Sequence, residues 1–121
     1  MWGDPLHSEP TLVNYGGSAE NNYIFVSTNG GMLHAISSQT GEEKFAFMPH
    51  QLISRADEFT VNRPGLGAGN ARQLYGLDSS WTAWRRSGET AISAPDAVYL
   101  YGGMRRGGYS YFALDLSLIH I

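Results

Sequence analysis

Residues 23–48, YIFVSTNGGMLHAISSQTGEEKFAFM, decide the fold class of this chain. Residues 23–28 are rich in β-branched and aromatic side chains, and an apolar run resumes at 32–36. Between them, residues 29–31 (Asn-Gly-Gly) tolerate the positive φ values of tight turns. This pattern predicts a β-hairpin.

A third strand follows this hairpin directly. The polar residues 37–41 turn the chain again, with Gly41 suited to a left-handed backbone conformation, and residues 43–48 form the next apolar run. Three consecutive antiparallel strands make a meander, which is typical of one blade of a β-propeller.

The composition favours β-structure. Of the 121 residues 42% are hydrophobic, and 15 glycines, seven tyrosines and three tryptophans suit short strands and tight turns better than long helices. The net charge of −3 argues against nucleic acid as a partner. The absence of cysteine excludes disulfides and Cys-ligated zinc sites, but it fits a reducing or an oxidising compartment equally well.

The sequence contains neither a membrane-spanning nor a targeting pattern. No apolar run approaches the roughly 20 residues of a transmembrane helix, and residues 1–5 lack the basic and hydrophobic regions of a signal peptide. We therefore expect that any export signal lies outside this chain.

One short amphipathic helix is predicted after Pro49, which suits a first helical turn. Its apolar residues, at helical spacing, are Leu52, Ile53, Ala56 and Phe59. A loop with a brief strand at 11–13 precedes the blade, and a loop rich in glycine at 62–70 follows the helix.

A second β-region is predicted between residues 74 and 115. Residues 74–86 indicate one or two short strands, with a turn near 78–80. Residues 97–101 and 109–114 indicate a hairpin around GGMRRGG at 102–108, where four glycines relieve the steric limits on the connection.

Strands at 23–26 and 98–101 are apolar at nearly every position, so we expect both faces of their sheets to be covered. Stacked propeller blades meet this condition, but a closed propeller needs about four to eight blades. The predicted fold is therefore all-β, an incomplete β-propeller with one clear antiparallel blade, part of a second, and one short helix in a connecting loop. Residues 1–121 form a fragment of one propeller domain, divided into a leading segment and first blade (1–48), a helix and loop (49–73), a second blade region (74–115) and a terminal hexapeptide (116–121).

Four motifs resemble the C-terminal propeller of the PilC/PilY family of type IV pilus biogenesis and tip-associated proteins. They are GDPLHS at 3–8, TNGGMLHA at 28–35, TGEE at 40–43 with FAFMP at 45–49, and GGMRRGG at 102–108 with YFALD at 111–115. The first blade alone also suits the repeats of pyrroloquinoline-quinone enzymes, whereas the initial motif and the Arg-Arg connection favour the pilus family.

The resemblance implies an exported protein of the bacterial cell envelope, outer surface or pilus, which supports pilus assembly, opposes retraction and in some members contributes to surface adhesion. The implied partners are pilus components such as minor pilins, and a host or abiotic surface. Some relatives carry an acidic calcium loop in or near this propeller. The comparable loop here, 86–96, offers only Glu89 and Asp96 as carboxylates, whereas Ca²⁺ takes six to eight oxygens, so no calcium site is carried over to this chain and any calcium site would lie elsewhere in the full-length protein.

The terminal hexapeptide, LSLIHI at 116–121, departs from the family pattern, in which the strand would continue into another turn. A common sequencing-adapter end encodes these six residues when it is read in frame. We therefore expect a non-native tail.

No metal site is predicted. The histidines, His7, His34, His50 and His120, include no pair at i, i+4 spacing and no neighbouring acidic pattern of a zinc hydrolase. His34 lies between two apolar residues on a strand, which favours a packed or hydrogen-bonded structural role.

Two further motifs have a binding and a structural interpretation. GLGAGN at 65–70 is similar to a phosphate-binding loop, but Asn70 replaces the third glycine of the dinucleotide fingerprint, no Lys follows and no strand precedes it, so a connecting loop is favoured. Arg105 and Arg106 suit bidentate bonds to an anionic partner. A solvated hairpin tip or an inter-blade salt bridge is the favoured interpretation.

Catalysis is not predicted, because Ser8, Ser27 and Ser37 have no identifiable partner base and no nucleophile elbow occurs. Six aromatic residues are enough for a recognition surface, although core packing between blades explains them more simply. They are Trp81, Trp84, Tyr99, Tyr101, Tyr109 and Tyr111.

The sequence and the resemblance together predict a non-catalytic propeller segment of a type IV pilus assembly and adhesion protein, with no catalytic, cofactor-binding or metal-binding residues and no cofactor. Rigid blades form a scaffold, and the loops at 49–73 and 86–96 present partner surfaces. Two alternatives stay open: a blade fragment of a pyrroloquinoline-quinone-dependent dehydrogenase, and an extracellular repeat protein unrelated to pili.

Overall fold

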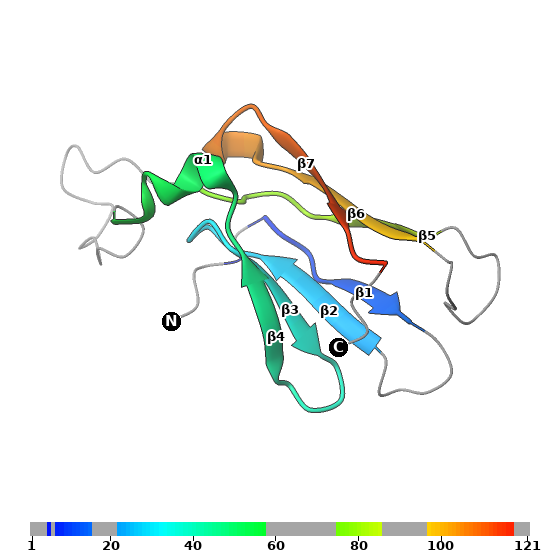
Figure 1. Ribbon diagram of the computed structural model, residues 1–121. Coiled ribbons are helices and arrows are strands. Elements are labelled where there is room, and N and C mark those ends of the chain that lie inside the picture. Colours follow the sequence, from blue (N-terminus) through cyan, green and yellow to red (C-terminus); the bar gives the residue numbers. More distant parts are fainter. Residues whose placement is uncertain (1–4, 6, 16–21, 58–74, 86–96, 118–121) are drawn as a thin grey trace.

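A computed structural model of the chain describes residues 5, 7–15, 22–57, 75–85 and 97–117. These residues form two antiparallel sheets, one of four strands and one of three, which lie in two facing layers (Figure 1). The fold is mostly β-sheet with one short α-helix, as the sequence predicted. That the sheets are blades of a propeller, and the division of the chain into blades, stay predictions.

The first sheet contains the predicted meander together with its leading strand. Its strands follow in chain order: β1 (Thr11–Asn14), β2 (Asn22–Ser27), β3 (Leu33–Ser37) and β4 (Glu43–Phe47). Gly31 and Gly41 lie in the two turns with φ of +86° and +73°, a region that a residue with a Cβ atom enters only at a cost. The left-handed conformation predicted for Gly41 is therefore confirmed.

The second sheet consists of β5 (Thr82–Arg85), β6 (Val98–Gly103) and β7 (Tyr111–Asp115), and a 3₁₀ turn, η2 (Arg105–Gly107), lies between the last two. The predicted boundary of β6 was wrong, because Gly102 and Gly103 belong to the strand and not to the connection. A Cβ atom on Gly102 would lie within 3.0 Å of the Trp81 ring. Gly102 therefore leaves space for the indole of Trp81, and it is not part of the turn.

The three strands of the second sheet repeat the register of the first three strands of the first sheet. In each sheet the central strand presents two aromatic residues to one face. The second of these, Phe25 or Tyr101, pairs with a threonine on one neighbouring strand and with an alanine on the other neighbouring strand. These cross-strand rows are Thr11, Phe25 and Ala35, then Val13, Tyr23 and Ser37, in the first sheet, and Thr82, Tyr101 and Ala113, then Trp84, Tyr99 and Asp115, in the second. Tyr99 and Tyr101 therefore hold the places of Tyr23 and Phe25.

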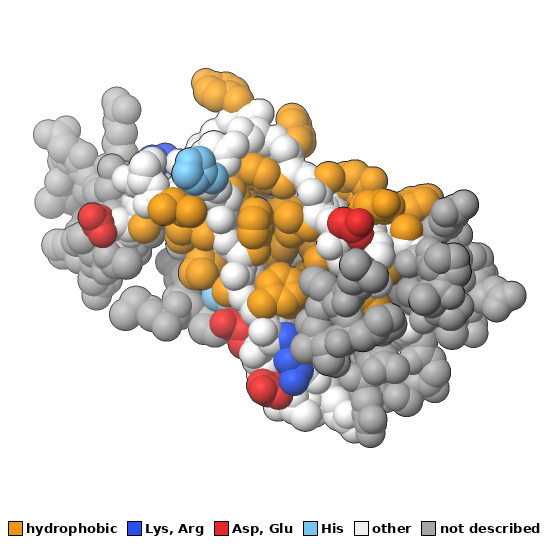
Figure 2. Space-filling view, viewed as in Figure 1, with side chains coloured by type: hydrophobic (Ala, Val, Ile, Leu, Met, Phe, Trp, Pro, Cys, Tyr) orange, Lys and Arg blue, Asp and Glu red, His pale blue; other side chains and the backbone are white. Residues whose placement is uncertain are grey.

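One hydrophobic core lies between the two sheets. Within it, Tyr15 meets Tyr23 edge-on at a centroid distance of 5.5 Å, and Trp81 stacks on Phe112 at 6.4 Å. Hydrophobic side chains reach the surface between β4 and β7 (Figure 2). The buried members of the core are Val13, Tyr15, Tyr23, Phe25, Leu33, Ala35, Leu52, Leu77, Trp81, Val98, Leu100, Met104 and Leu116.

Backbone atoms also join the two sheets, at a place that we call the glycine contact: Gly31, Gly76 and Gly107. A Cβ atom on Gly76 would lie 2.6 Å from the backbone N and Cα atoms of Gly31, and one on Gly107 would lie within 3.0 Å of the Gly76 carbonyl. The N–H of Gly76 donates a hydrogen bond to Oδ1 of Asn29 at 3.1 Å. Three segments distant in sequence therefore touch where side chains are absent.

The predicted helix is present as α1 (His50–Ile53), beside η2 at one end of the two layers (Figure 1). Leu52 is buried as predicted, but Ile53 is 54% exposed, so its predicted place among the apolar residues of the packed face was wrong. Pro49 has ψ of 141° and precedes the helix, so its predicted place in the first turn was wrong. Phe59 lies outside the described residues. Among the helices that the structure describes, none has the length and apolarity needed to span a membrane.

The first two residues of the terminal hexapeptide are bonded to β6. The N–H of Leu116 donates to the Val98 carbonyl at 2.8 Å, and the N–H of Val98 donates to the Ser117 hydroxyl at 3.0 Å. Hydrogen bonds from the hydroxyl and backbone N–H of Ser117 lower the pKa of Asp115. Residues 118–121 lie outside the described residues, and the non-native origin of the hexapeptide stays a prediction.

Candidate interaction surface

The second sheet turns a set of aromatic side chains away from the core. Along β5, β6 and β7 the exposed residues alternate with those that face the first sheet. Trp84 is 49% exposed, Tyr101 46% and Tyr111 89%. We call this surface the aromatic face, and its members are Thr82, Trp84, Tyr99, Tyr101, Tyr111 and Ala113.

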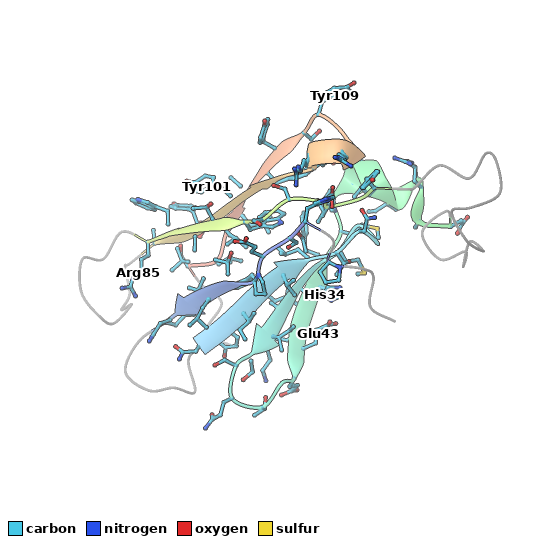
Figure 3. The ribbon with its side chains drawn as sticks, turned by 180° about the vertical axis from the view of Figure 1, so that it is seen from behind. His34, Glu43, Arg85, Tyr101 and Tyr109 are labelled. Atoms are coloured by element: carbon cyan, nitrogen blue, oxygen red, sulfur yellow. The ribbon has the colours of Figure 1, made fainter. Side chains whose placement is uncertain are left out.

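The rings of the aromatic face form a continuous row across β5 and β6. Trp84 stacks on Tyr99 with a centroid distance of 5.8 Å and an interplanar angle of 26°, and Tyr99 lies 6.4 Å from Tyr101. Figure 3 shows Tyr101 on the side of its sheet that is turned away from β1–β4. Neighbouring rings hold one another in place, so this surface is ordered before any partner arrives.

Core packing between blades was the favoured interpretation of the six aromatic residues, and between the two described sheets it is confirmed for Trp81 alone. Trp81 is 3% exposed and belongs to the core, but Trp84, Tyr101 and Tyr111 project outward and Tyr109 is fully exposed at the tip near η2 (Figure 3). The reason is the two-residue period of a strand, because residues on one strand that lie two apart share the same face. Tyr99 and Tyr101 must share a face, and that face is not the one on the core.

A shallow hollow of about 320 Å³ lies at one end of the second sheet. Glycine backbone at 102–103 contributes to its lining, and Tyr101 and Tyr111 stand beside it. Its remaining lining residues are Ser79, Ser80 and Phe112. The hollow combines exposed ring surfaces with two serine hydroxyl groups, a lining suited to contacts with another protein surface.

The first sheet also has an outward face, and it is aliphatic. Leu12 is 61% exposed, Ile24 and Ile36 are half-buried, and Val26 is 7% exposed. These four residues are the aliphatic face. Leu12 pairs with Ile24 and Ile24 pairs with Ile36, so the three side chains form a row across β1, β2 and β3.

His34 lies on the same outward side as the aliphatic face, and its predicted structural role is confirmed. The side chain is 5% exposed, and Nδ1 lies 2.6 Å from Oε2 of Glu43 on the adjacent strand (Figure 3). The pair joins β3 to β4 next to the register shift between Ala35 and Ile36.

His7 forms a contact that sequence reasoning missed. Its Nδ1 lies 2.8 Å from both carboxylate oxygens of Asp78, whose side chain is fully buried. The two residues are 71 positions apart, so no local spacing signals the pair. His7 thereby attaches the leading segment of the chain to the loop that precedes β5.

The hydroxyls of Ser8, Ser27 and Ser37 bond to a neighbouring serine or to the backbone. Ser27 Oγ donates to the Ser79 carbonyl at 2.7 Å and lies 3.0 Å from Ser8 Oγ, and Ser37 Oγ accepts from the N–H of Thr40 at 3.5 Å. These contacts join loops and strands. That the chain has no catalytic residues stays a prediction.

The Arg-Arg connection lies at an exposed tip. Arg106 donates to the Tyr75 hydroxyl at 3.3 Å, and its guanidinium carbon lies 5.5 Å from the centre of the Tyr75 ring. Arg105 has φ of 49° at the start of η2. The tip is solvated, in agreement with one of the two favoured interpretations, and Arg106 contacts an aromatic ring there.

Other predicted features lie outside the described residues. They are the GLGAGN loop at 65–70, Glu89 and Asp96 of the 86–96 loop, His120, and most of the two loops expected to present partner surfaces. Within the described part of the chain, no three His, Asp or Glu side chains gather closely enough to hold a metal ion. His50 is exposed at the start of α1.

Tyr15 is the strongly shifted titratable group of the described core. Burial, with a smaller contribution from Tyr23, raises its pKa to about 12. The Tyr15 hydroxyl donates to the Leu116 carbonyl at 3.3 Å. The neutral hydroxyl thus joins the end of β1 to the end of the second sheet.

Two curated proteins are similar to this chain. The type IV pilus biogenesis factor PilY1 homolog of Xylella fastidiosa (strain Temecula1) is 30% identical over 99 residues, which cover 78% of this chain and 7% of that protein. The type IV pilus biogenesis factor PilY1 of Pseudomonas aeruginosa (strain UCBPP-PA14) is 27% identical over 94 residues, again 78% of this chain and 7% of that protein. The chain therefore spans about 7% of the length of these relatives. No family model and no solved structure matches it.

Proposed function

We propose that this chain is a segment of a type IV pilus biogenesis factor of the PilY1 kind, and that its two sheets are neighbouring blades of a β-propeller. The identity of 30% over 99 residues with a pilus biogenesis factor carries the functional part of the proposal. The shared register of the two sheets supports the propeller part, because propeller blades repeat one meander around an axis.

The proposed role is that of a non-catalytic scaffold in the cell envelope or on the pilus. Two sheets with one common core form a rigid support, and the exposed aromatic face offers ring surfaces of the kind that anchor protein interfaces. Pilus components such as minor pilins are the proposed partners. Surface adhesion is part of the same proposal.

A chimaera tests the pilus assignment. The matching segment of the Pseudomonas aeruginosa relative is replaced by residues 11–117 of this chain, and surface pili are counted by electron microscopy in a strain that lacks its own factor. We expect piliation well above that of the deletion strain. Pili that stay at the deletion level, with the chimaera present at normal abundance, would contradict the proposal.

A matched control uses the same chimaera with Leu100→Asp. Leu100 is fully buried between the sheets, so a charge there prevents the segment from folding. Loss of pili in this control, with rescue by the unaltered segment, attributes the effect to the folded sheets.

The quinone-dependent dehydrogenase finds no support in the two relatives, both of which are named as pilus biogenesis factors. Titration of the full-length protein with pyrroloquinoline quinone separates the two functions. Saturable binding together with dye-linked alcohol oxidation would favour the enzyme.

A further inference from the structure

The connection between β6 and β7 carries two neighbouring positive charges at one end of the second sheet. Arg105 and Arg106 are both exposed there, and we call this pair the arginine tip. Tyr109 lies on the same connection and is fully exposed, and Figure 3 shows it at the outer end of the connection. Residues 97–110 contain no Asp or Glu, so the tip has a local positive charge although the chain has a net charge of −3.

Arg106 is held in a fixed position by an aromatic ring. Its guanidinium carbon lies 5.5 Å from the centre of the Tyr75 ring, and its Nη1 donates a hydrogen bond to the Tyr75 hydroxyl at 3.3 Å. A guanidinium has five N–H donors, so this hydrogen bond leaves donors for a further acceptor. The ring therefore positions the guanidinium without using up its capacity to bind an anion.

The backbone of the connection is anchored as well. The N–H of Gly107 donates to the Met104 carbonyl at 2.9 Å, and the N–H of Met104 donates to the Ser110 carbonyl at 3.2 Å. Gly107 also belongs to the glycine contact, where it packs against the backbone of Gly76. Because the connection is ordered before a ligand arrives, binding there costs less conformational entropy than binding to a flexible loop.

Neither arginine takes part in an ion pair between described residues. The ion pairs in that part of the chain join His7 with Asp78, His34 with Glu43 and Lys44 with Glu42. The inter-blade salt bridge that the sequence analysis considered therefore does not form between the two described sheets. Within the described residues, the charge of the arginine tip is not neutralised by a carboxylate.

The arginine tip stays accessible in the propeller that we propose. Further blades would cover the outer faces of the two sheets, whereas the β6–β7 connection leaves its sheet at the ends of the strands, beside α1 (Figure 1). Connections at strand ends are also the places where a rigid scaffold commonly carries its binding residues. The exposure of the tip therefore does not depend on how many blades flank these two sheets.

We propose that the arginine tip binds an acidic segment of a partner protein. Carboxylates accept paired hydrogen bonds from guanidinium groups, and these charge-assisted bonds are stronger than neutral ones. Tyr109 favours a protein partner, because arginine and tyrosine together are the residue types that anchor protein interfaces. The proposal rests on the geometry of the tip and is independent of the pilus assignment.

Binding of a fluorescein-labelled oligoglutamate peptide to the full-length protein tests the proposal, with fluorescence anisotropy as the readout. We expect saturable binding that R105Q/R106Q weakens by about tenfold or more. Binding should also weaken as the salt concentration rises from about 50 to about 150 mM, because salt screens exposed charges. The absence of saturable binding, or parent-like affinity in R105Q/R106Q, would overturn the proposal.

Two matched variants separate a positioned site from general charge attraction. K44Q/R85Q removes two positive charges elsewhere on the sheets, and its affinity should stay within about twofold of the parent protein. Tyr75→Leu retains both arginines but removes the ring beneath Arg106, and it should weaken binding about two- to fivefold. A loss in K44Q/R85Q equal to that in R105Q/R106Q, or undiminished binding in Tyr75→Leu, would overturn the proposal.

Further controls address folding and the class of ligand. Both arginines are exposed, so R105Q/R106Q should give the circular dichroism spectrum and melting curve of the parent protein. If the double variant does not fold, Arg105→Gln replaces it, since it leaves the contact between Arg106 and Tyr75 in place. A heparin oligosaccharide with the same net charge as the peptide is measured in the same assay. Tighter binding of this oligosaccharide, lost in the tip variant, would overturn the assignment to an acidic protein segment.

Discussion

The indole of Trp81 rests directly on the backbone of Gly102, leaving no room for even one carbon atom on that residue. The same ring stacks on Phe112 of β7, so it packs against two adjacent strands of the second sheet. Trp81 itself is 3% exposed and lies just before β5. The packing of this ring therefore depends on a residue that the sequence marks only as a flexible glycine.

Gly102→Ala should destabilise the chain by about 1–3 kcal/mol, because the new methyl group overpacks a filled site. Urea denaturation followed by tryptophan fluorescence measures the loss. The matched control is Gly103→Ala, whose Cβ would lie 3.1 Å from the exposed ring of Tyr111, which can move aside. An equal loss in both variants would show that overpacking against the Trp81 ring is not the cause of the effect.

His7→Ala should cost about 1–3 kcal/mol of unfolding free energy, since it removes a hydrogen-bond partner from the fully buried carboxylate of Asp78. Asp78→Asn in the His7→Ala background should restore part of that loss, because an amide without a partner is cheaper to bury than a charge. His50→Ala, at an exposed position on α1, is the control. A double-mutant cycle with coupling below about 0.3 kcal/mol would mean that the contact contributes nothing.

The raised pKa of Tyr15 predicts that the folded chain loses stability in strongly alkaline solution. Its pKa is about 12 in the folded chain against 10.0 for an ordinary tyrosine, so the unfolded chain loses the proton first. This contribution to stability is fully present below pH 10, decreases between pH 10 and 12, and amounts to at most about 3 kcal/mol.

Tyr15→Phe should remove that part of the pH dependence. At pH 7 the variant loses the hydrogen bond to Leu116, at a cost of about 1 kcal/mol, but it should approach and then exceed the parent chain in stability as the pH rises toward 12. Tyr109→Phe, at a fully exposed position, should follow the parent chain throughout. Parallel stability curves for Tyr15→Phe and the parent chain would refute the shift.

Leu100→Ala should destabilise the chain by about 2–5 kcal/mol, since it opens a cavity at a fully buried position between the sheets. Leu12→Ala provides the same chemical change at a position that is 61% exposed, and its effect should stay within about 0.5 kcal/mol. Equal effects at the two positions would contradict the assignment of the core to the space between the sheets.

The strands were predictable from the sequence because their signals are local. Apolar runs between Gly-rich turns located five strands, and each predicted end lies within two residues of the observed end. These strands are β2, β3, β4, β6 and β7. Gly41 was recognised as a left-handed turn residue for the same reason.

The features that could not be predicted from the sequence are contacts between residues that lie far apart in the chain. The pair of His7 and Asp78 spans 71 positions, and the packing of the Trp81 ring on the backbone of Gly102 has no local signal in the sequence. The outward direction of Tyr101 follows from which face meets the first sheet. A run that is apolar at every position, such as 98–101, cannot indicate that choice.

Gly31, Gly76 and Gly107 act as a spacer between the two layers. Side chains at an interface can rotate to fill a gap when the layers shift, but backbone atoms have no rotamers with which to do so. A small slide of one layer over the other would therefore break this contact at once, so the contact opposes such a slide. Exchange of apolar side chains elsewhere in the interior should change how tightly the layers pack, while the distance between them at this point stays that of two touching main chains.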